Sequence, residues 1–459
     1  MKRQNHKYLY LAGLMLAIML GGATRARADA VVDWNIITGQ TIPFATRPGG
    51  SPGLDYAMVH AAIYDAVQAI DGRFEPYAVG IPGASGSPAA AAARAAHDVL
   101  VYRFPAQTAS LDATYLAYLA SHGLAEDDPG VAVGQLAAVG IIALRANDGS
   151  WPAVPEVFNG GTGIGEWRPT PPAFAPMAVP WLGAVTPFTL DHPTQFRAPQ
   201  PPRLNSREYA KDYNEVKALG SLVNSSRTPE QTDIAYFYAD NHFLIWNRAL
   251  QGLANTYLDN IGDTARLFAL CSLVMADGPI TAWDSKKYYN LWRPSTAIQE
   301  GDNDGNPRTA GDPTWQPLIP NPNYPDYTSG ANSLSGSVTR MLARFFGTDE
   351  VIFSTTSNHP LAVQKTRIYG RFSDAAEDVV NARIYLGIHF RFADTAARKQ
   401  GEHIADCAFE NLLQPVDDCD QHDGHGHGHG HDGHGHGHGH DNNGHGHDNN
   451  GHGHKKGHH

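Results

Sequence analysis

Residues 54–70 have the sequence LDYAMVHAAIYDAVQAI, in which apolar side chains recur at intervals of three and four residues. This spacing places the apolar side chains on one face of an α-helix that packs against other elements. Residues 89–104, 108–120 and 131–146 show the same pattern. Strand patterns are sparse in the rest of the chain, so the sequence predicts an all-α protein.

The middle of the chain separates two helical halves. Residues 149–202 are rich in proline, glycine and tryptophan and predict a long ordered loop. Thr228-Pro229-Glu230-Gln231 is a strong helix start, with a threonine cap, a proline at the first position and a glutamine three residues after the cap. We expect helices at residues 208–223, 230–255, 264–276, 280–290, 333–346, 374–387 and 395–413. The pattern predicts two helical bundles in one large domain, with halves at residues 29–225 and 226–418.

The N-terminus has the features of a secretory signal peptide over residues 1–28. Basic residues at positions 2, 3 and 7 precede an apolar run, and small-x-small cleavage sites follow it. An uncleaved anchor is the alternative. We expect no later segment to be long and apolar enough to span a bilayer. We therefore expect a soluble mature protein that is secreted or periplasmic, without stable membrane insertion.

The C-terminal tail, residues 419–459, consists almost entirely of histidine, glycine, aspartate and asparagine. Because it has no apolar residues to bury, we expect it to be disordered. Alternating histidine and glycine suits loose binding of Zn²⁺, Ni²⁺ or Cu²⁺, either in the cell or only in a test tube. The candidate ligands are His425, His427, His429, His431, His434, His436, His438 and His440.

The charge balance argues against one class of partner, and the three cysteines predict a buried thiol and a disulfide. The formal net charge is −12, which argues against a nucleic-acid partner because such a protein needs a basic face. Of the three cysteines, Cys271 lies in an apolar run and is expected to be a buried thiol. Export permits a disulfide, and Cys407–Cys419 is the expected pair.

Two separated segments could contribute to an anion site. Lys286 and Arg293 are seven residues apart, close to two helical turns, so both could project to one side. Alone, such a pair is more typical of a solvated face. Ser329 and Gly330 stand at the entrance of a helix, where free backbone N–H groups bind anions. Alone, they are more typical of an ordinary helix cap.

A third segment contains Arg383 and His389, six residues apart. On a straight helix they would be out of phase, so they converge on one ligand only if the helix ends near Gly387. Alone, this histidine is more typical of a buried residue that is hydrogen-bonded to a carbonyl.

Together the three segments resemble the signature of the vanadium haloperoxidase and type-2 phosphatidic acid phosphatase superfamily. That signature is Lys-x6-Arg-Pro, then Pro-Ser-Gly-His, then Arg-x5-His. The first and third motifs match in order and spacing, and Ser329-Gly330 matches the middle of the second. Residues 58–67 and 235–247 are similar to helices of secreted bacterial haloperoxidase-like proteins. That likeness implies that Asp240 pairs with a pocket arginine, Arg383.

The chain departs from this signature in its second motif. The family's histidine falls on Ala331 and its proline on Thr328. In the family that histidine is the expected acid–base group, and alanine cannot replace it. Asp394 also stands one place beyond the family's usual aspartate.

The resemblance implies a role for each pocket residue. Lys286, Arg293 and Arg383 would neutralise the oxygens of vanadate, or of phosphate in its place, with hydrogen bonds from Ser329 and Gly330. His389 would be the axial group, either a vanadium ligand or a nucleophile that forms a phosphohistidine.

Three functions follow. The first is a vanadate-dependent haloperoxidase-like oxidoreductase that uses hydrogen peroxide and a halide, bromide or iodide rather than chloride. The second is an acid phosphatase that acts on small phosphoesters. The third is an exported metal-binding protein with a catalytically impaired pocket.

Overall fold

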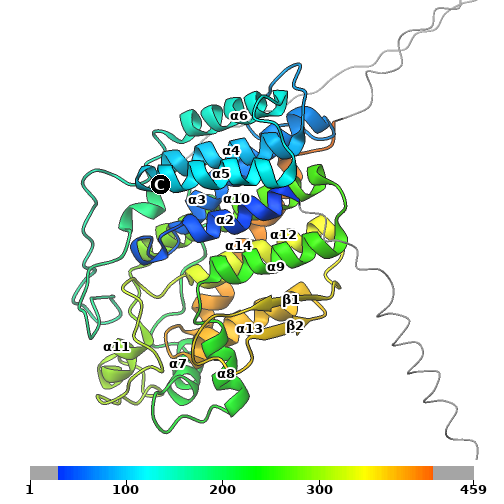
Figure 1. Cartoon of the computed structure of the whole chain (residues 1–459). Helices are drawn as coiled ribbons and strands as arrows, with labels where there is room; N and C mark the ends of the chain where they lie inside the picture. Colours follow the sequence, from blue (N-terminus) through cyan, green and yellow to red (C-terminus); the bar gives the residue numbers. More distant parts are fainter. Residues whose placement is uncertain (1–28, 417–459) are drawn as a thin grey trace, which may run out of the picture. The chain divides into compact units, whose positions relative to one another are not determined.

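The computed structural model describes residues 29–416, and regular structure in this part is almost entirely helical (Figure 1). The helices are α2 (Ala30–Thr41), α3 (Pro52–Asp71), α4 (Pro88–Arg103), α5 (Thr108–His122), α6 (Pro129–Arg145), α7 (Arg207–Leu219), α8 (Pro229–Phe237), α9 (His242–Tyr257), α10 (Ile261–Tyr289), α11 (Pro294–Gln299), α12 (Gly330–Phe346), α13 (Phe372–Tyr385) and α14 (Arg391–Asn411). Strands β1 (Phe353–Thr356) and β2 (Thr366–Tyr369) form a short antiparallel ribbon. The predicted all-α class is confirmed.

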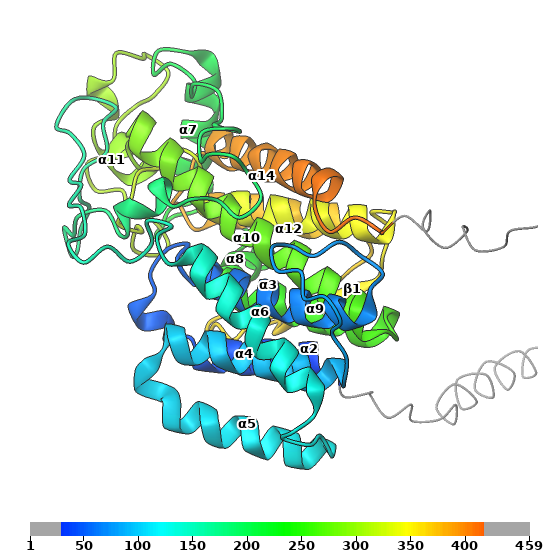
Figure 2. The ribbon, with the colours of Figure 1, turned by 90° about the horizontal axis from the view of Figure 1, so that it is seen from above.

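Helix α10 lies at the centre of the structure, packed between α3 and α12. Figure 2 shows α12 and α14 on one side of α10, and α4 and α5 beyond α3. α10 is long and apolar enough to cross a membrane by length and composition, contrary to the expectation for this part of the chain. Since 94% of its most apolar window is buried inside the protein, it has the burial of a core helix.

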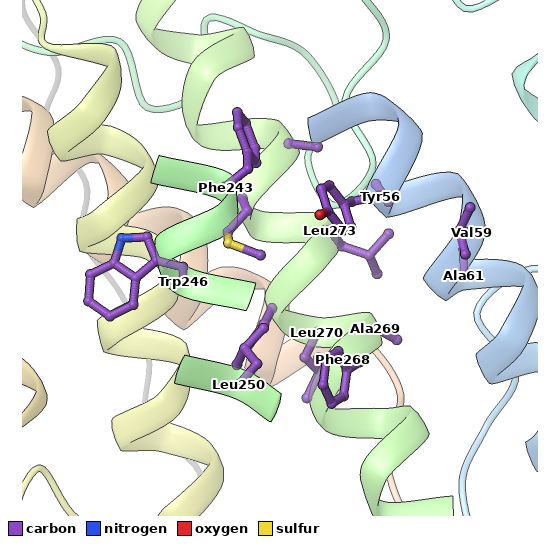
Figure 3. Packing of buried hydrophobic residues seen from close by; sticks show 14 of the residues in the cluster. Tyr56, Val59, Ala61, Phe243, Trp246, Leu250, Phe268, Ala269, Leu270 and Leu273 are labelled. Atoms are coloured by element: carbon purple, nitrogen blue, oxygen red, sulfur yellow. The ribbon is translucent and has the colours of Figure 1, made fainter. Parts of the chain in front are cut away.

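The core joins the two halves of the sequence. Figure 3 shows Tyr56 of α3 beside Phe243 of α9 and Leu273 of α10. The rings of Tyr56 and Phe243 are stacked with centroids 6.4 Å apart. Burying each large apolar side chain contributes about 1.5–3 kcal/mol to folding. Helices from both halves therefore share one hydrophobic core.

Two predicted helix boundaries are wrong. The helix expected over residues 230–255 is broken between α8 and α9, where Asn241 caps α9 by accepting from the backbone N–H groups of Phe243 and Leu244. Asparagine competes with the helix for such bonds, which favours a new start. The two helices expected at 264–276 and 280–290 form one helix, α10, with Pro279 inside it.

The predicted capping box and the predicted loop are both observed. Thr228 accepts from the backbone N–H of Gln231, whose side chain accepts in return from the Thr228 backbone N–H. The loop over residues 149–202 contains only one short 3-10 turn, Pro180–Ala184. Its Trp167 donates through its backbone N–H to the carbonyl of Asn290, directly after α10. The loop therefore packs beside the segment that carries Arg293.

Glycines bring α12 and α14 into close contact. A Cβ at Gly401 would lie 2.2 Å from the carbonyl oxygen of Ser333, and one at Gly336 would lie 2.5 Å from that of Arg398. This approach places the start of α12 beside the start of α14.

Three expectations involve residues outside 29–416 and stay predictions: the signal peptide, the histidine-rich tail and the Cys407–Cys419 pair. The division of the chain into halves at residue 225 also stays a prediction.

Candidate oxyanion site

Lys286 is in the last turn of α10 and is completely buried. Its ammonium group donates to the carbonyl oxygens of Pro325 at 2.7 Å and Asp326 at 3.1 Å. It also lies over the ring of Tyr324, 4.8 Å from the centroid. Burial, followed by the nearby Arg293 guanidinium, holds the pKa of Lys286 well below its ordinary value. The helix ends just after it, because Asn290 adopts a left-handed conformation with φ +46°.

Arg293 precedes Pro294 at the start of α11 and is also fully buried. Its Nε donates to the carbonyl of Tyr324 at 2.7 Å, and its Nη1 donates to the carbonyl of Ile388 at 2.7 Å. Its Nη2 has no hydrogen-bond partner among residues 29–416. Lys286 and Arg293 thus meet on the same turn, residues 324–326, as their spacing predicted.

His389 follows the break that the sequence predicted after α13. The helix ends at Tyr385, and Gly387 has φ +77°. A Cβ at Gly387 would lie 2.4 Å from the carbonyl oxygen of Gly220, so this turn requires glycine. Nη1 of Arg293 lies 3.4 Å from Nδ1 of His389 and 3.2 Å from Nε2. Such similar distances place the guanidinium over the ring face, where it repels a protonated ring.

The carboxylate of Asp326 orients the His389 ring. Nδ1 of His389 lies 2.7 Å from Oδ1 of Asp326, so Nδ1 carries the proton and donates it. The lone pair of the neutral ring is then on Nε2, where a metal or phosphorus centre could be bound. Burial, then Arg293, Lys286 and Arg383, hold the pKa of His389 well below its ordinary value. Burial raises the pKa of Asp326 to about 7, against the lowering effect of Arg293 and Lys286.

Ser329 and Gly330 form the entrance of α12. Ser329 is buried and is the residue before the helix, and its backbone N–H donates to the carbonyl of Ala393 at 3.2 Å. Gly330 is the first helical residue, and a Cβ there would lie 2.6 Å from the ring of Trp283. Gly330 and Ala331 are half-buried, so the first turn of α12 is partly exposed to solvent. The N–H groups of this first turn have no acceptor within the helix and can face an anion.

Arg383 completes the basic cluster from the last turn of α13. Its Nη1 donates to the carbonyl of Tyr238 at 3.3 Å, and its Nε has no partner within the described part of the chain. The pKa values of Lys286 and His389 are both lowered by Arg383, as expected for side chains that share one site.

The predicted pair of Asp240 with Arg383 is wrong. Asp240 accepts from Arg248 at 3.3 Å and from the backbone N–H of Asn358 at 2.8 Å. The new helix start at Asn241 places Arg248 within reach of this carboxylate, so Asp240 does not need a pocket arginine.

Two carboxylates were not predicted as site residues. Asp326 was visible only as part of a turn-rich run three residues before Ser329. Asp394 accepts from Asn332 Nδ2 at 2.7 Å, and Asn332 also donates to Ser329 Oγ at 3.4 Å. Burial raises the pKa of Asp394 to about 8. Their positions depend on how α12 meets α14, which sequence spacing does not reveal.

The donors fit a tetrahedral oxyanion such as vanadate or phosphate. Three buried cations face two buried carboxylates, which leaves a net positive site. Arg293 and Arg383 each retain a buried N–H without a partner among the described residues. Orphaned donors in a protein interior are costly, and an anion would satisfy them. Within residues 29–416, no group of three or more His, Cys, Asp or Glu residues is placed to hold a metal cation.

Comparisons with known proteins agree with this geometry. Residues 266–418 match the family model described as the VCPO second helical-bundle domain. The vanadium chloroperoxidase of Curvularia inaequalis is 27% identical over 286 residues, which cover 48% of this chain and 46% of that protein. The match therefore spans less than half of the relative's length.

Solved structures share the fold. A structure described as the first bacterial vanadium-dependent iodoperoxidase has a TM-score of 0.70 and 24% identity, covering 85% of this chain and 97% of that one. A holo-type bacterial vanadium-dependent chloroperoxidase has a TM-score of 0.61 and 17% identity, covering 85% and 93%. The motif residues lie together in one buried site within residues 266–418, and these residues match the family's second helical bundle, so the comparisons support the vanadium haloperoxidase and type-2 phosphatidic acid phosphatase superfamily for this chain.

Proposed function

We propose that this protein is a vanadate-dependent haloperoxidase-like oxidoreductase that uses hydrogen peroxide to oxidise iodide or bromide. The observation that carries the proposal is the buried His389 ring, whose Nδ1 lies 2.7 Å from Oδ1 of Asp326 beside the buried guanidinium of Arg293. A nitrogen lone pair beside a positive cradle is the donor set that an axially bound oxyanion needs.

Each residue has a defined task in this proposal. Lys286, Arg293 and Arg383 would balance the negative charge of bound vanadate, and the N–H of Gly330 with the hydroxyl of Ser329 would donate hydrogen bonds to it. His389 would bind through Nε2. When bound, vanadate supplies the Lewis-acid centre that activates hydrogen peroxide toward attack by a halide.

Iodide and bromide are favoured over chloride because Ala331 lacks the imidazole that the family uses to move protons. Iodide and bromide are easier to oxidise than chloride, so their oxidation depends least on proton transfer by this imidazole. On the basic and apolar residues before position 28, we also propose that the protein is exported.

The test is halide oxidation by the full mature chain after treatment with a chelator that strips metals from the histidine-rich tail. Orthovanadate is then titrated with hydrogen peroxide and iodide, bromide or chloride. We expect vanadate-dependent oxidation of iodide and bromide that is lost in His389→Ala. No oxidation at any pH from about 4 to 8, the range in which histidine titrates, would refute the proposal.

The same pocket could instead hydrolyse phosphoesters, because a neutral Nε2 is also a nucleophile for phosphorus. Turnover of an activated aryl phosphate without vanadate, lost in His389→Ala, would identify this alternative. Activated leaving groups need little protonation, so Ala331 would affect them least.

A further inference from the structure

Helices α9 and α12 run parallel in a constant register. Nε1 of Trp246 donates to Oγ of Ser335 at 2.9 Å, and the rings of Tyr257 and Phe346 lie 5.8 Å apart. In both pairs the residue numbers differ by 89. Because the two pairs are three helical turns apart, the helices keep the same alignment along their length.

One turn earlier, this register pairs His242 with Ala331. Position 242 precedes Trp246 by four residues, and position 331 precedes Ser335 by four. Their numbers also differ by 89. Residues four apart lie on the same face of a helix, so the face of α9 that carries Trp246 toward α12 also carries His242. An imidazole therefore lies opposite the position where the family has its second-motif histidine.

His242 also lies beside the basic cluster. Its ring is stacked on that of Tyr238, with centroids 6.2 Å apart and planes 14° from parallel. The carbonyl of Tyr238 accepts from Nη1 of Arg383 at 3.3 Å. The pKa of His242 is lowered to about 3 by burial and then by the charge of Arg383, against a raising effect of the Tyr238 backbone. His242 therefore lies close to Tyr238 and Arg383, and the helix register places Ala331 opposite it.

Both ring nitrogens of His242 are buried, and neither makes a hydrogen bond of good geometry in the described structure, although the backbone of Tyr238 lies close enough to act on the ring. A histidine with a purely structural role normally has its nitrogens satisfied. His97 shows this ordinary case, with Nδ1 2.8 Å from Asp98 and Nε2 2.9 Å from Asp112. The neighbour of His242 on α12 is an alanine, which offers no polar group. A ligand in the oxyanion site would be the missing partner.

We propose that His242 supplies, from α9, the acid–base imidazole that Ala331 leaves out of α12. This inference rests on the proposed function. In this role the imidazole would accept one proton from hydrogen peroxide at the oxyanion site and give it to the hydroxide that leaves, so that the leaving group is water. The number of protons is conserved, and His242 returns to its neutral form.

The test compares His242→Asn with a matched control, His359→Asn. His359 is also stacked on a tyrosine, Tyr236, with centroids 5.4 Å apart, but it lies outside the site. Two quantities are measured for each protein: the dissociation constant of orthovanadate by calorimetry, and the pH profile of iodide oxidation. Calorimetry reports on the contact itself, independently of turnover.

We expect His242→Asn to weaken orthovanadate binding about tenfold, the loss of one hydrogen bond to a charged group, and to flatten one limb of the pH profile. His359→Asn should match the wild type in both. Adding Ala331→His to His242→Asn should restore both quantities, because the imidazole then returns to the facing position. This double variant also shows that the His242→Asn protein is folded.

Wild-type affinity and an unchanged pH profile in His242→Asn would overturn the inference. So would a profile that changes only in Asp394→Asn, since that would assign proton transfer to the carboxyl group. If the wild type binds orthovanadate through His242 but oxidises no halide, the contact is upheld and only the proposed oxidoreductase activity fails.

Discussion

Nδ1 of His389 lies 2.7 Å from Oδ1 of Asp326, and this contact decides which ring nitrogen faces the site. While Asp326 is ionised, its carboxylate can only accept from Nδ1–H, so the ring is held as the tautomer with its lone pair on Nε2. Asparagine has the same shape but can donate through Nδ2, which would favour the opposite tautomer. The side chain of residue 326 therefore controls the chemistry of residue 389.

We expect Asp326→Asn to lower orthovanadate affinity and iodide turnover by about 10–100-fold, the usual effect of losing a partner that orients a ligating histidine. Titration calorimetry and an iodide assay measure the two quantities. Asp240→Asn is the control, because Asp240 contacts Arg248 instead of the site. Equal loss in both variants would contradict an orienting role for Asp326.

Anion binding should raise the unfolding temperature. A ligand that binds only the folded state adds about 2.7 kcal/mol at a concentration one hundred times its dissociation constant. We expect orthovanadate to raise the melting temperature in a concentration-dependent way, measured by differential scanning fluorimetry. In Arg383→Met this rise should be much smaller.

Without an anion, Arg383→Met should melt at the same temperature as the wild type or higher. Its guanidinium is buried with a single 3.3 Å bond, and uncompensated burial of charge is costly. A clearly lower melting temperature would mean that Arg383 supports the fold, and not primarily the anion.

His60 should make the fold sensitive to acid. It is completely buried, Asn35 donates to its Nε2 at 2.8 Å, and burial lowers its pKa to about 3. The unfolded chain takes up a proton near pH 6.5, whereas the folded chain does not. The stability contributed by neutral His60 is therefore complete above pH 6.5 and is lost as the pH falls toward 3.

Replacement by glutamine, which can still accept from Asn35, should remove this dependence. We expect the free energy of unfolding of His60→Gln to fall less steeply between pH 6 and 4, by about 1.4 kcal/mol per pH unit at most. Urea titrations at several pH values measure the slope. The exposed His192, changed to glutamine, should leave the slope unaltered.

Contact between α12 and α14 should tolerate no added methyl group. A Cβ at Gly401 would meet the Ser333 carbonyl oxygen at 2.2 Å, so Gly401→Ala should destabilise the protein by about 1–3 kcal/mol. It should also weaken orthovanadate binding, because these helices carry Ser329 and Asp394. Gly252→Ala on α9 is the control: apart from its own helical turn, no described atom lies within 4 Å of its Cβ position, so a helix-favouring alanine should stabilise it by up to about 1 kcal/mol. Destabilisation by both would show that the effect is not specific to the contact.

The sequence predicted what depends on local spacing. Lys286 and Arg293 meet on one turn because they flank a helix end, and His389 turns inward because Gly387 stops α13. The break before His242 was missed because Asn241 lies inside an otherwise continuous apolar pattern, and only its capping bonds reveal a new helix start. The continuity of α10 through Pro279 was missed because proline usually ends a helix. Asp326 and Asp394 were missed as site residues for another reason: each acts through a contact between elements distant in the sequence.

The parallel alignment of α9 and α12 has a consequence for how related chains are compared. Because the two helices keep one register over three turns, a side chain from either helix can place the same chemical group at the same position. Evolution can then move a side chain from one helix to the other without altering the backbone. Whether a family member has kept its chemistry therefore depends on which side chains surround its site in three dimensions. The loss of one motif residue in an alignment does not identify an inactive protein.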